Sequence, residues 1–201
     1  MTESRKALII FTRNPELGKC KTRLAITIGD KAALDIYKHL LQHTATVTKN
    51  VNADCYVFYS EAIIDKDIWD NNFFNKKLQN GNDLGERMHN AFKELFRLGY
   101  HSVCIVGSDL LDLNSKIIEE AYKRLYENDV VIGPAEDGGY YLLGIKKLHP
   151  KLFKDKIWGT NTVYESTLSD LQGENVYKLK ELKDIDTFED IEHYEELKAF
   201  L

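Results

Sequence analysis

Residues 102–109 read Ser-Val-Cys-Ile-Val-Gly-Ser-Asp, a short apolar run that ends in glycine, serine and aspartate. A run of this length, rich in β-branched residues, is typical of a buried strand. Two similar runs, Lys6–Phe11 and Val130–Gly133, are also followed by polar clusters. In open α/β sheets ligands bind beyond the carboxyl ends of the strands. The polar residues after these three runs, at positions 12–23, 107–112 and 134–140, are therefore the first candidates for a functional site.

Helical spacing of apolar residues separates these runs along the chain. This spacing predicts a first helix that begins after Asp30, which is taken as its cap. Further helices are predicted at Asp83–Leu98, around Ile117–Leu125, at Thr162–Leu171 and from Thr187 onward. Further strands are predicted at Asp54–Ser60, Tyr140–Ile145 and Val176–Leu179. Strands that alternate with helices at this spacing indicate right-handed crossovers and a mostly parallel central sheet with helices on both faces. We therefore expect an α/β three-layer sandwich, folded as a single domain over residues 1–201 because no repeat or linker interrupts the chain.

Composition narrows the function classes. The chain has 201 residues, 43% hydrophobic and 29% charged, with a formal net charge of -5. An acidic balance argues against a nucleic-acid partner. The apolar run at Ala7–Phe11 is too short for a signal peptide or a membrane span, so we expect a cytoplasmic protein. The three cysteines and six histidines lack metal-type spacing, and Cys55 and Cys104, inside strand-like runs, are expected to be core thiols.

The loop Thr12–Arg23 is strongly basic. It carries four cations in twelve residues, Arg13, Lys19, Lys21 and Arg23, and its course is shaped by Pro15 and Gly18. Guanidinium forks, a mobile lysine and a glycine that admits close backbone approach would suit a diphosphate. A solvated surface loop would have the same composition. The loop lacks the Walker pattern, so a P-loop ATPase is not expected.

Carboxylates follow the Ser102–Val106 strand and recur near the carboxyl terminus. Asp109 and Asp112 offer the oxygen ligands that Mg²⁺ or Mn²⁺ prefers, and Asp109 is the stronger candidate. Asp112 could instead cap the next helix, and capping is an alternative for Asp109 as well. Near the end, Thr187 and Asp190 resemble a capping box. That local role leaves Asp184 and Asp186 free, and Asp186 is a candidate second metal ligand opposite Asp109.

The segment Pro134–Tyr141 combines Glu136 and Asp137 with the pair Gly138–Gly139 and the aromatic Tyr140. Flexible glycines permit backbone contact with a ligand, and the acids could accept sugar hydroxyls or the proton of a nucleophile. A plain turn between two strands would use the same glycines.

Taken together, the chain resembles the GT-A-type nucleotide-diphospho-sugar transferase superfamily. More specifically, it looks like a bacterial family of glycosyltransferases associated with arsenosugar biosynthesis, formerly a domain of unknown function. The resemblance covers nearly the whole chain and rests on ordered blocks at Phe11–Gly18, Lys21–Leu24, Asp83–Met88, Gly107–Asp109, Gly133–Tyr140 and Asp184–Thr187. Two departures are Leu110-Leu111 in place of a Cys-Pro-like pair, and Gly159 in place of the serine in Trp-Ser-Thr.

The resemblance implies roles for these residues. Arg13, Lys21 and Arg23 would hold the phosphates, Asp109 the metal, and the Glu136–Tyr140 segment the acceptor. The base and ribose would lie against the first-strand loop, which includes Thr12, Pro15 and Gly18, and against the segment from Gln79 to Asp83. Arg87 belongs to the same matching block as Asp83.

The prediction is therefore a metal-assisted glycosyltransferase that moves a sugar from a nucleotide-diphospho-sugar to a small-molecule acceptor, with Asp137 or Glu136 as base and Mg²⁺ or Mn²⁺ as cofactor. A nucleotidyltransferase that releases pyrophosphate from a nucleoside triphosphate is one alternative. A non-catalytic nucleotide-binding module is another. No nucleic acid or membrane span is expected, and a homodimer is left open.

Overall fold

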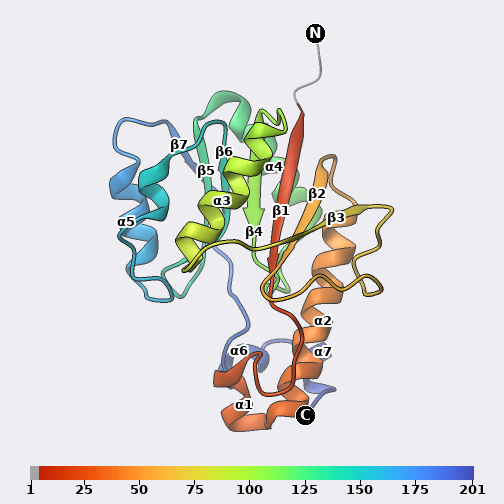
Figure 1. Cartoon of the computed structure of the whole chain (residues 1–201). Coiled ribbons are helices and arrows are strands. Elements are labelled where there is room, and N and C mark those ends of the chain that lie inside the picture. The colour runs from red at the N-terminus through yellow and green to blue at the C-terminus, as the bar shows by residue number, and fades with distance from the viewer. Residues whose placement is uncertain (1–4) are drawn as a thin grey trace.

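The computed structural model describes residues 5–201, and this part of the chain contains a single seven-stranded sheet (Figure 1). The strands are β1 (Lys6–Thr12), β2 (Asp54–Tyr59), β3 (Phe74–Leu78), β4 (Ser102–Val106), β5 (Val130–Pro134), β6 (Tyr140–Ile145) and β7 (Val176–Lys178). Their order across the sheet is β3-β2-β1-β4-β6-β5-β7. All neighbours pair in parallel except β6, which is antiparallel to both β4 and β5. The predicted mostly parallel α/β sheet is confirmed.

The antiparallel strand has a local cause. β5 and β6 are joined by the short connection at residues 135–139, and parallel neighbours would need a much longer crossover. The hairpin turns at Gly138, whose φ of 86° suits glycine. The polar segment that follows β5 is therefore a hairpin loop at the carboxyl edge of the parallel strands.

Helices cover both faces of the sheet. Helices α2 (Asp30–Lys49) and α4 (Ser115–Glu127) pack on one face, where Leu8 and Ile10 of β1 point. Helix α3 (Leu84–Arg97), the short 3₁₀ helix η1 (Pro150–Phe153) and the end of α5 (Val163–Asp170) pack on the other, where Ala7 and Ile9 point. Alternate residues of β1 thus enter opposite cores, as expected for a central strand buried on both sides.

A third hydrophobic cluster forms a small helical cap beyond the carboxyl ends of the strands (Figure 1). It joins α1 (Thr22–Ile28), the first half of α2, α6 (Phe188–Ile191) and α7 (Glu195–Lys198). Leu24, Ile36 and Ile185 are fully buried in it. The cap faces the edge of the sheet at which the strands β1 and β4 end.

Several elements differ from the expectations drawn from sequence. Helix α1, strand β3 and helix η1 were not predicted. The edge strand β3 reads Phe-Asn-Lys-Lys-Leu and is largely polar, a composition that protects an exposed sheet edge but hides the strand from hydrophobicity patterns. The predicted carboxyl-terminal helix is two short helices, α6 and α7, separated at Tyr194, and this break lets Ile191 and Leu197 both enter the cap.

The predicted cap of α2 was wrong, and the alternative role of Asp112 as the cap of α4 is not observed. Asp30 is the first residue of α2, and the cap is Gly29, whose φ of 84° lets it end α1 and begin α2 in one step. Asp112 does not cap α4, because the side chain of Asn114 accepts a hydrogen bond from Ile117 N–H instead. The Asp112 carboxylate accepts one from the Tyr194 hydroxyl, at 2.9 Å.

The cysteines are free and buried, which confirms Cys55 and Cys104 as core thiols. Burial raises the pKa of both thiols to about 12. Across residues 5–201, each helix is too short or too polar to cross a bilayer.

Gly85 offers a test of how α3 is held against η1. An added Cβ would overlap the carbonyl oxygen of Phe153 and crowd the Trp158 indole. Gly85→Ala should therefore lower the free energy of unfolding by about 1–3 kcal/mol in spite of the higher helix propensity of alanine, because the obstacle is backbone. Urea denaturation measures this, with the exposed Lys93→Ala in the same helix as control. A Gly85→Ala protein as stable as the control would contradict the packing.

Candidate functional site

A cleft with two connected chambers lies between the sheet edge and the helical cap. The larger, the loop chamber, has a volume of about 1090 Å³ and is lined mainly by the basic loop after β1, the loop after β3 and the end of β4. The smaller, the hairpin chamber, has a volume of about 300 Å³ and is lined by the β5–β6 hairpin, α3 and the segment around Trp158. Asp109, Asp137 and Asp186 line both chambers. These three carboxylates thus mark the junction.

The start of the basic loop is held by the buried Tyr37 of α2. The Tyr37 hydroxyl accepts a hydrogen bond from Arg13 N–H at 2.9 Å and donates one to the Arg13 carbonyl at 3.1 Å. Asn14, also buried, bonds to Ser60 and to backbone groups of Glu61 and Ala62 after β2. The loop backbone is therefore fixed from both sides.

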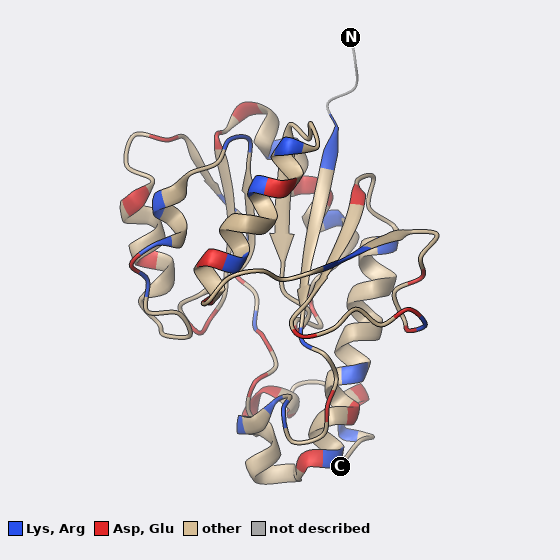
Figure 2. Ribbon diagram, viewed as in Figure 1, with Lys and Arg blue, Asp and Glu red and all other residues tan. Residues whose placement is uncertain are grey.

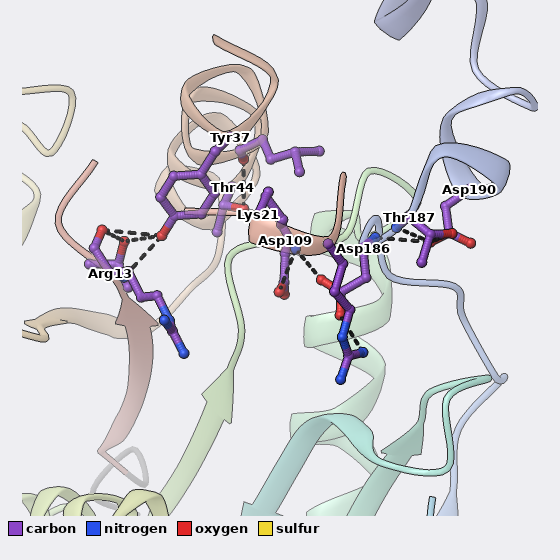
Figure 3. Close-up of polar contacts among 11 residues, drawn as sticks. Arg13, Lys21, Tyr37, Thr44, Asp109, Asp186, Thr187 and Asp190 are labelled. Carbon is purple, nitrogen blue, oxygen red and sulfur yellow. Dashed lines mark hydrogen bonds and ion pairs between the residues drawn. The ribbon is translucent and has the colours of Figure 1, made fainter. Parts of the chain in front are cut away.

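The side chain of Arg13 differs from its fixed backbone. It is exposed, lines the loop chamber, and points away from Tyr37 (Figure 3). Within residues 5–201 its guanidinium forms no ion pair. An unpaired guanidinium at a concave surface is a ready partner for a phosphate group.

Asp109 and Asp186, far apart in sequence, are brought together by backbone contacts. Ile185 N–H donates to the Asp109 carbonyl at 3.1 Å, and the buried Ile185 side chain anchors this segment in the cap. Because neighbouring side chains alternate in direction, Asp184 and Asp186 line the cleft while Ile185 faces the core. Asp190 holds the segment from below by accepting from the N–H groups of Asp186 and Thr187, at 3.0 and 2.7 Å.

Lys21 lies between the two carboxylates (Figure 3). Its ammonium is 2.8 Å from Asp186 Oδ1 and 3.1 Å from Asp109 Oδ2, and its side chain is 5% exposed. Burial disfavours the charged form, but attraction to Asp109 and Asp186 outweighs it and raises the pKa of Lys21 above its ordinary value. Lys21 also has a left-handed backbone conformation, with φ 49°. Arg23 adds a weaker contact to Asp186, at 3.6 Å.

The cleft carries more negative than positive charge at the junction. Burial and the neighbouring carboxylates of Asp137, Asp109 and Asp186 raise the pKa of Asp184 to about 6. The Asp137 carboxylate accepts from Gly139 N–H at 2.8 Å, inside the hairpin turn. Figure 2 shows the basic segments of the β1 loop facing the acidic connection that leads to α6.

The hairpin chamber has aromatic and apolar walls above these acids. Phe11, Met88, Tyr140 and Trp158 line it, and none of the described residues around it is lysine, arginine or histidine. Such walls suit the flat faces of a sugar ring or another uncharged group, whereas the charged side chains that an anion would meet there are carboxylates.

Comparison with known proteins identifies the family. A model of the family described as "Uncharacterized protein conserved in bacteria (DUF2064)" matches residues 43–160, more than half of the chain. The chain belongs to this family. A solved structure from Desulfovibrio desulfuricans G20, provisionally named a nucleotide-diphospho-sugar transferase, is similar to this DUF2064 member at 33% identity with a TM-score of 0.86. That match covers 92% of this chain and 84% of the other.

More distant relatives of this DUF2064 member share only the fold. The 4-diphosphocytidyl-2C-methyl-D-erythritol synthase of Anaerococcus prevotii DSM 20548 has a TM-score of 0.65 at 13% identity, with 98% of this chain and 96% of that one covered. A cytidylyltransferase from Leptospira borgpetersenii has a TM-score of 0.61 at 16% identity, with 99% and 88% covered. None of the curated proteins matches the chain.

The structure gathers most of the site residues predicted from sequence, although it assigns them no ligand. The loop chamber is lined by Thr12, Arg13, Lys21, Arg23, Gln79, Asp83, Arg87, Asp109, Asp137 and Asp186. The hairpin chamber adds Gly139 and Tyr140. Four predicted residues line neither chamber: Pro15, which borders a separate groove beside α2, and Gly18, Glu136 and Gly138.

Some predicted ligand residues already have structural partners. The Gln79 amide donates to the carbonyls of Thr12 and Phe58, at 3.1 and 2.9 Å. Asp83 caps α3 by accepting from Glu86 N–H at 2.8 Å. The Arg87 Nε donates to the Gly81 carbonyl at 3.0 Å. These side chains fix the loop after β3, and any contact they make with a ligand is additional.

Other lining residues were missed from sequence. Tyr37 and Met88 follow the apolar face of their helices and carry no separate signal there. Ser108 lies inside the Gly-Ser-Asp block but was given no role. Asn14 was also given no role, and its bonds across to the end of β2 leave no local signal in the sequence.

Asp190 provides a pH test of the anchor below Asp186. Burial alone would raise its pKa, but hydrogen bonds from the Thr187 and Asp186 backbone and from Lys183 lower it below the usual 3.8. A lowered carboxyl pKa stabilises the fold above the unfolded pKa, and this contribution is lost as pH falls through the folded pKa. Asp190→Asn should lower the free energy of unfolding by about 1 kcal/mol at pH 7, and the difference should shrink below about pH 3.8.

Urea titrations at pH 7 and pH 3 measure this difference. The exposed neighbour Glu189 supplies the control, since Glu189→Gln should change stability by no more than about 0.5 kcal/mol at either pH. An Asp190→Asn deficit that is equal at both pH values would show that the carboxylate charge does not stabilise the segment.

Proposed function

We propose that the protein is a metal-assisted glycosyltransferase that moves a sugar from a nucleotide-diphospho-sugar to an uncharged or cationic small-molecule acceptor. The observation that carries this proposal is the junction of the two chambers. On one side lies a basic loop with an unpaired Arg13, and on the other an aromatic chamber whose ionisable lining consists of carboxylates and tyrosines. The narrower association with arsenosugar biosynthesis stays a prediction from sequence resemblance.

The donor diphosphate would lie in the loop chamber. Arg13 and Arg23 are exposed there and can meet phosphate oxygens without losing a buried partner. The nucleoside would then extend past Thr12 and the loop after β3, and the sugar would project toward Asp109. The anomeric carbon would thus lie near the junction, within reach of the hairpin chamber.

The residues present suit Mg²⁺ or Mn²⁺. Asp109 and Asp186 converge on one point with hard oxygen ligands, and the Lys21 ammonium between them shows that the position favours positive charge. Such a cation, when bound, would neutralise charge that develops on the departing diphosphate. Within residues 5–201 no group of three or more acidic, histidine or cysteine side chains is arranged to hold a metal ion, so phosphate and water oxygens would supply the other ligands.

Asp137 is the candidate base. It lies at the junction, whereas Glu136 is exposed outside both chambers. An acceptor hydroxyl in the hairpin chamber would give its proton to Asp137 as its oxygen bonds to the anomeric carbon. The bond between that carbon and the diphosphate breaks, and the electron pair leaves with the nucleoside diphosphate.

Arg13 tests the placement of the donor. Arg13→Gln should weaken binding of nucleoside diphosphates by about 10-fold or more, since it removes a charge-assisted contact worth roughly 1.5–3 kcal/mol, and should leave the melting temperature nearly unchanged. Calorimetric titration of a panel of nucleoside diphosphates measures the affinity, with the exposed Arg97→Gln on α3 as control. Equal affinities in Arg13→Gln and the wild type would remove Arg13 from the phosphate site.

The leaving group separates the two transferase reactions. With a panel of sugar nucleotides, acceptors and Mn²⁺, the protein should release a nucleoside diphosphate and no pyrophosphate, and Asp109→Asn should slow this release by about 10²-fold or more. Attack on an anomeric carbon expels the whole diphosphate, whereas attack on the α-phosphorus of a triphosphate expels pyrophosphate. Pyrophosphate formed as a triphosphate is consumed would favour the nucleotidyltransferase, and tight binding without turnover of either kind would favour a non-catalytic module.

A further inference from the structure

We infer that Lys21 acts as a built-in cation: its ammonium lies between Asp109 and Asp186 and must leave before these carboxylates can hold a divalent cation. This inference rests on the metal-binding part of the proposed function and adds an exchange step to it. The step concerns the order in which charges enter the site, and it needs neither a sugar nor an acceptor.

The geometry makes the two positive charges competitors. The Lys21 ammonium bonds to one oxygen of each carboxylate, at 2.8 and 3.1 Å. A divalent cation held by both aspartates would draw on the same two carboxylates. Two cations that close together would repel each other strongly in a partly buried site. Occupancy by one therefore excludes the other.

The carboxylates are open to the cleft although the lysine is not. Asp109 and Asp186 each have 37% of their side chain exposed, against 5% for Lys21. A cation can thus approach the carboxylates from the cavity while Lys21 reaches them from the protein side. A purely structural ion pair would not need its acidic half to line a cavity.

The Lys21 ammonium has a second possible position, in the loop chamber. It lines the loop chamber together with Arg13 and Arg23, where the diphosphate would bind. Lysine is a mobile point charge on a flexible stem, so its ammonium can turn from carboxylate to phosphate without moving the loop. Diphosphate and divalent cation would then each favour binding of the other, because both require Lys21 to leave the carboxylates.

The test measures Mn²⁺ binding alone, without nucleotide. Lys21→Gln should bind Mn²⁺ about 10-fold or more tightly than the wild type, because removing the competing ammonium makes the free site fully competent. Lys19→Gln is the matched control: it removes one charge from the same loop, but Lys19 pairs with Glu16 and Glu61. Its Mn²⁺ affinity should stay within about 2-fold of the wild type, because exposed charges are well screened. Electron paramagnetic resonance of free Mn²⁺ gives both values.

Equal or weaker binding by Lys21→Gln would overturn the inference, and so would a lack of Mn²⁺ binding in every variant. If Lys21→Gln does not fold, amine labelling of the wild type followed by mass spectrometry decides. Saturating Mn²⁺ should speed labelling of Lys21 and leave Lys19 unchanged, whereas unaltered protection of Lys21 would overturn the exchange. Neither measurement involves turnover, so a failure of glycosyl transfer would leave both results standing.

Discussion

The cleft depends on one backbone hydrogen bond, from Ile185 N–H to the carbonyl of Asp109, together with burial of the Ile185 side chain. Asp109 follows β4, a central strand of the sheet, whereas Ile185 belongs to the segment that closes the helical cap. Their contact ties the helical cap to the end of the sheet, and it places the side chains on either side of Ile185 beside Asp109. Without this bond the sheet edge would still be concave, but its carboxylates would not converge.

The carboxylates that gather at the cleft repel one another, and positive charge from the amino-terminal loop offsets this repulsion. Asp109, Asp137 and Asp186 come from three different segments, and burial together with their negative charges raises the pKa of the Asp184 carboxyl. Lys21 offsets part of this repulsion by pairing with two of the carboxylates, and it does so from a strained left-handed backbone conformation. Strain at a residue that lines a cavity is a cost that packing alone would not favour. The loop, the sheet edge and the cap are thus held together by charge as well as by apolar burial.

Sequence could predict what is encoded locally. The run that ends at Asp109 is apolar, short and followed by glycine, so both the strand and the polar residues beyond it could be identified, and the basic loop was visible from composition. Strand β3 could not be predicted, because its sequence Phe-Asn-Lys-Lys-Leu shows no apolar alternation. The contact of Lys21 with Asp186 spans 165 residues, and no local pattern reports it. Gln79 and Asp83 line the cleft, as expected for the site residues, but the bonds of Gln79 to the carbonyls of Thr12 and Phe58 depend on how distant segments meet.

The fold does not choose between the reactions, because the distant relatives that share it include cytidylyltransferases. The charge of the hairpin chamber distinguishes the two reactions better than the fold does. An enzyme that joins a nucleotide to a phosphate or carboxylate acceptor must hold that anion, which requires guanidinium, ammonium or several backbone N–H groups near the reacting atom. Here the walls around Trp158 and Tyr140 are aromatic, and the charges beneath them are Asp137 and Asp184. An anionic acceptor would meet repulsion at the point of reaction, whereas a hydroxyl group would meet a proton acceptor. The proposal of sugar transfer therefore rests on the charge of a few side chains that line the second chamber, and the fold alone does not support it.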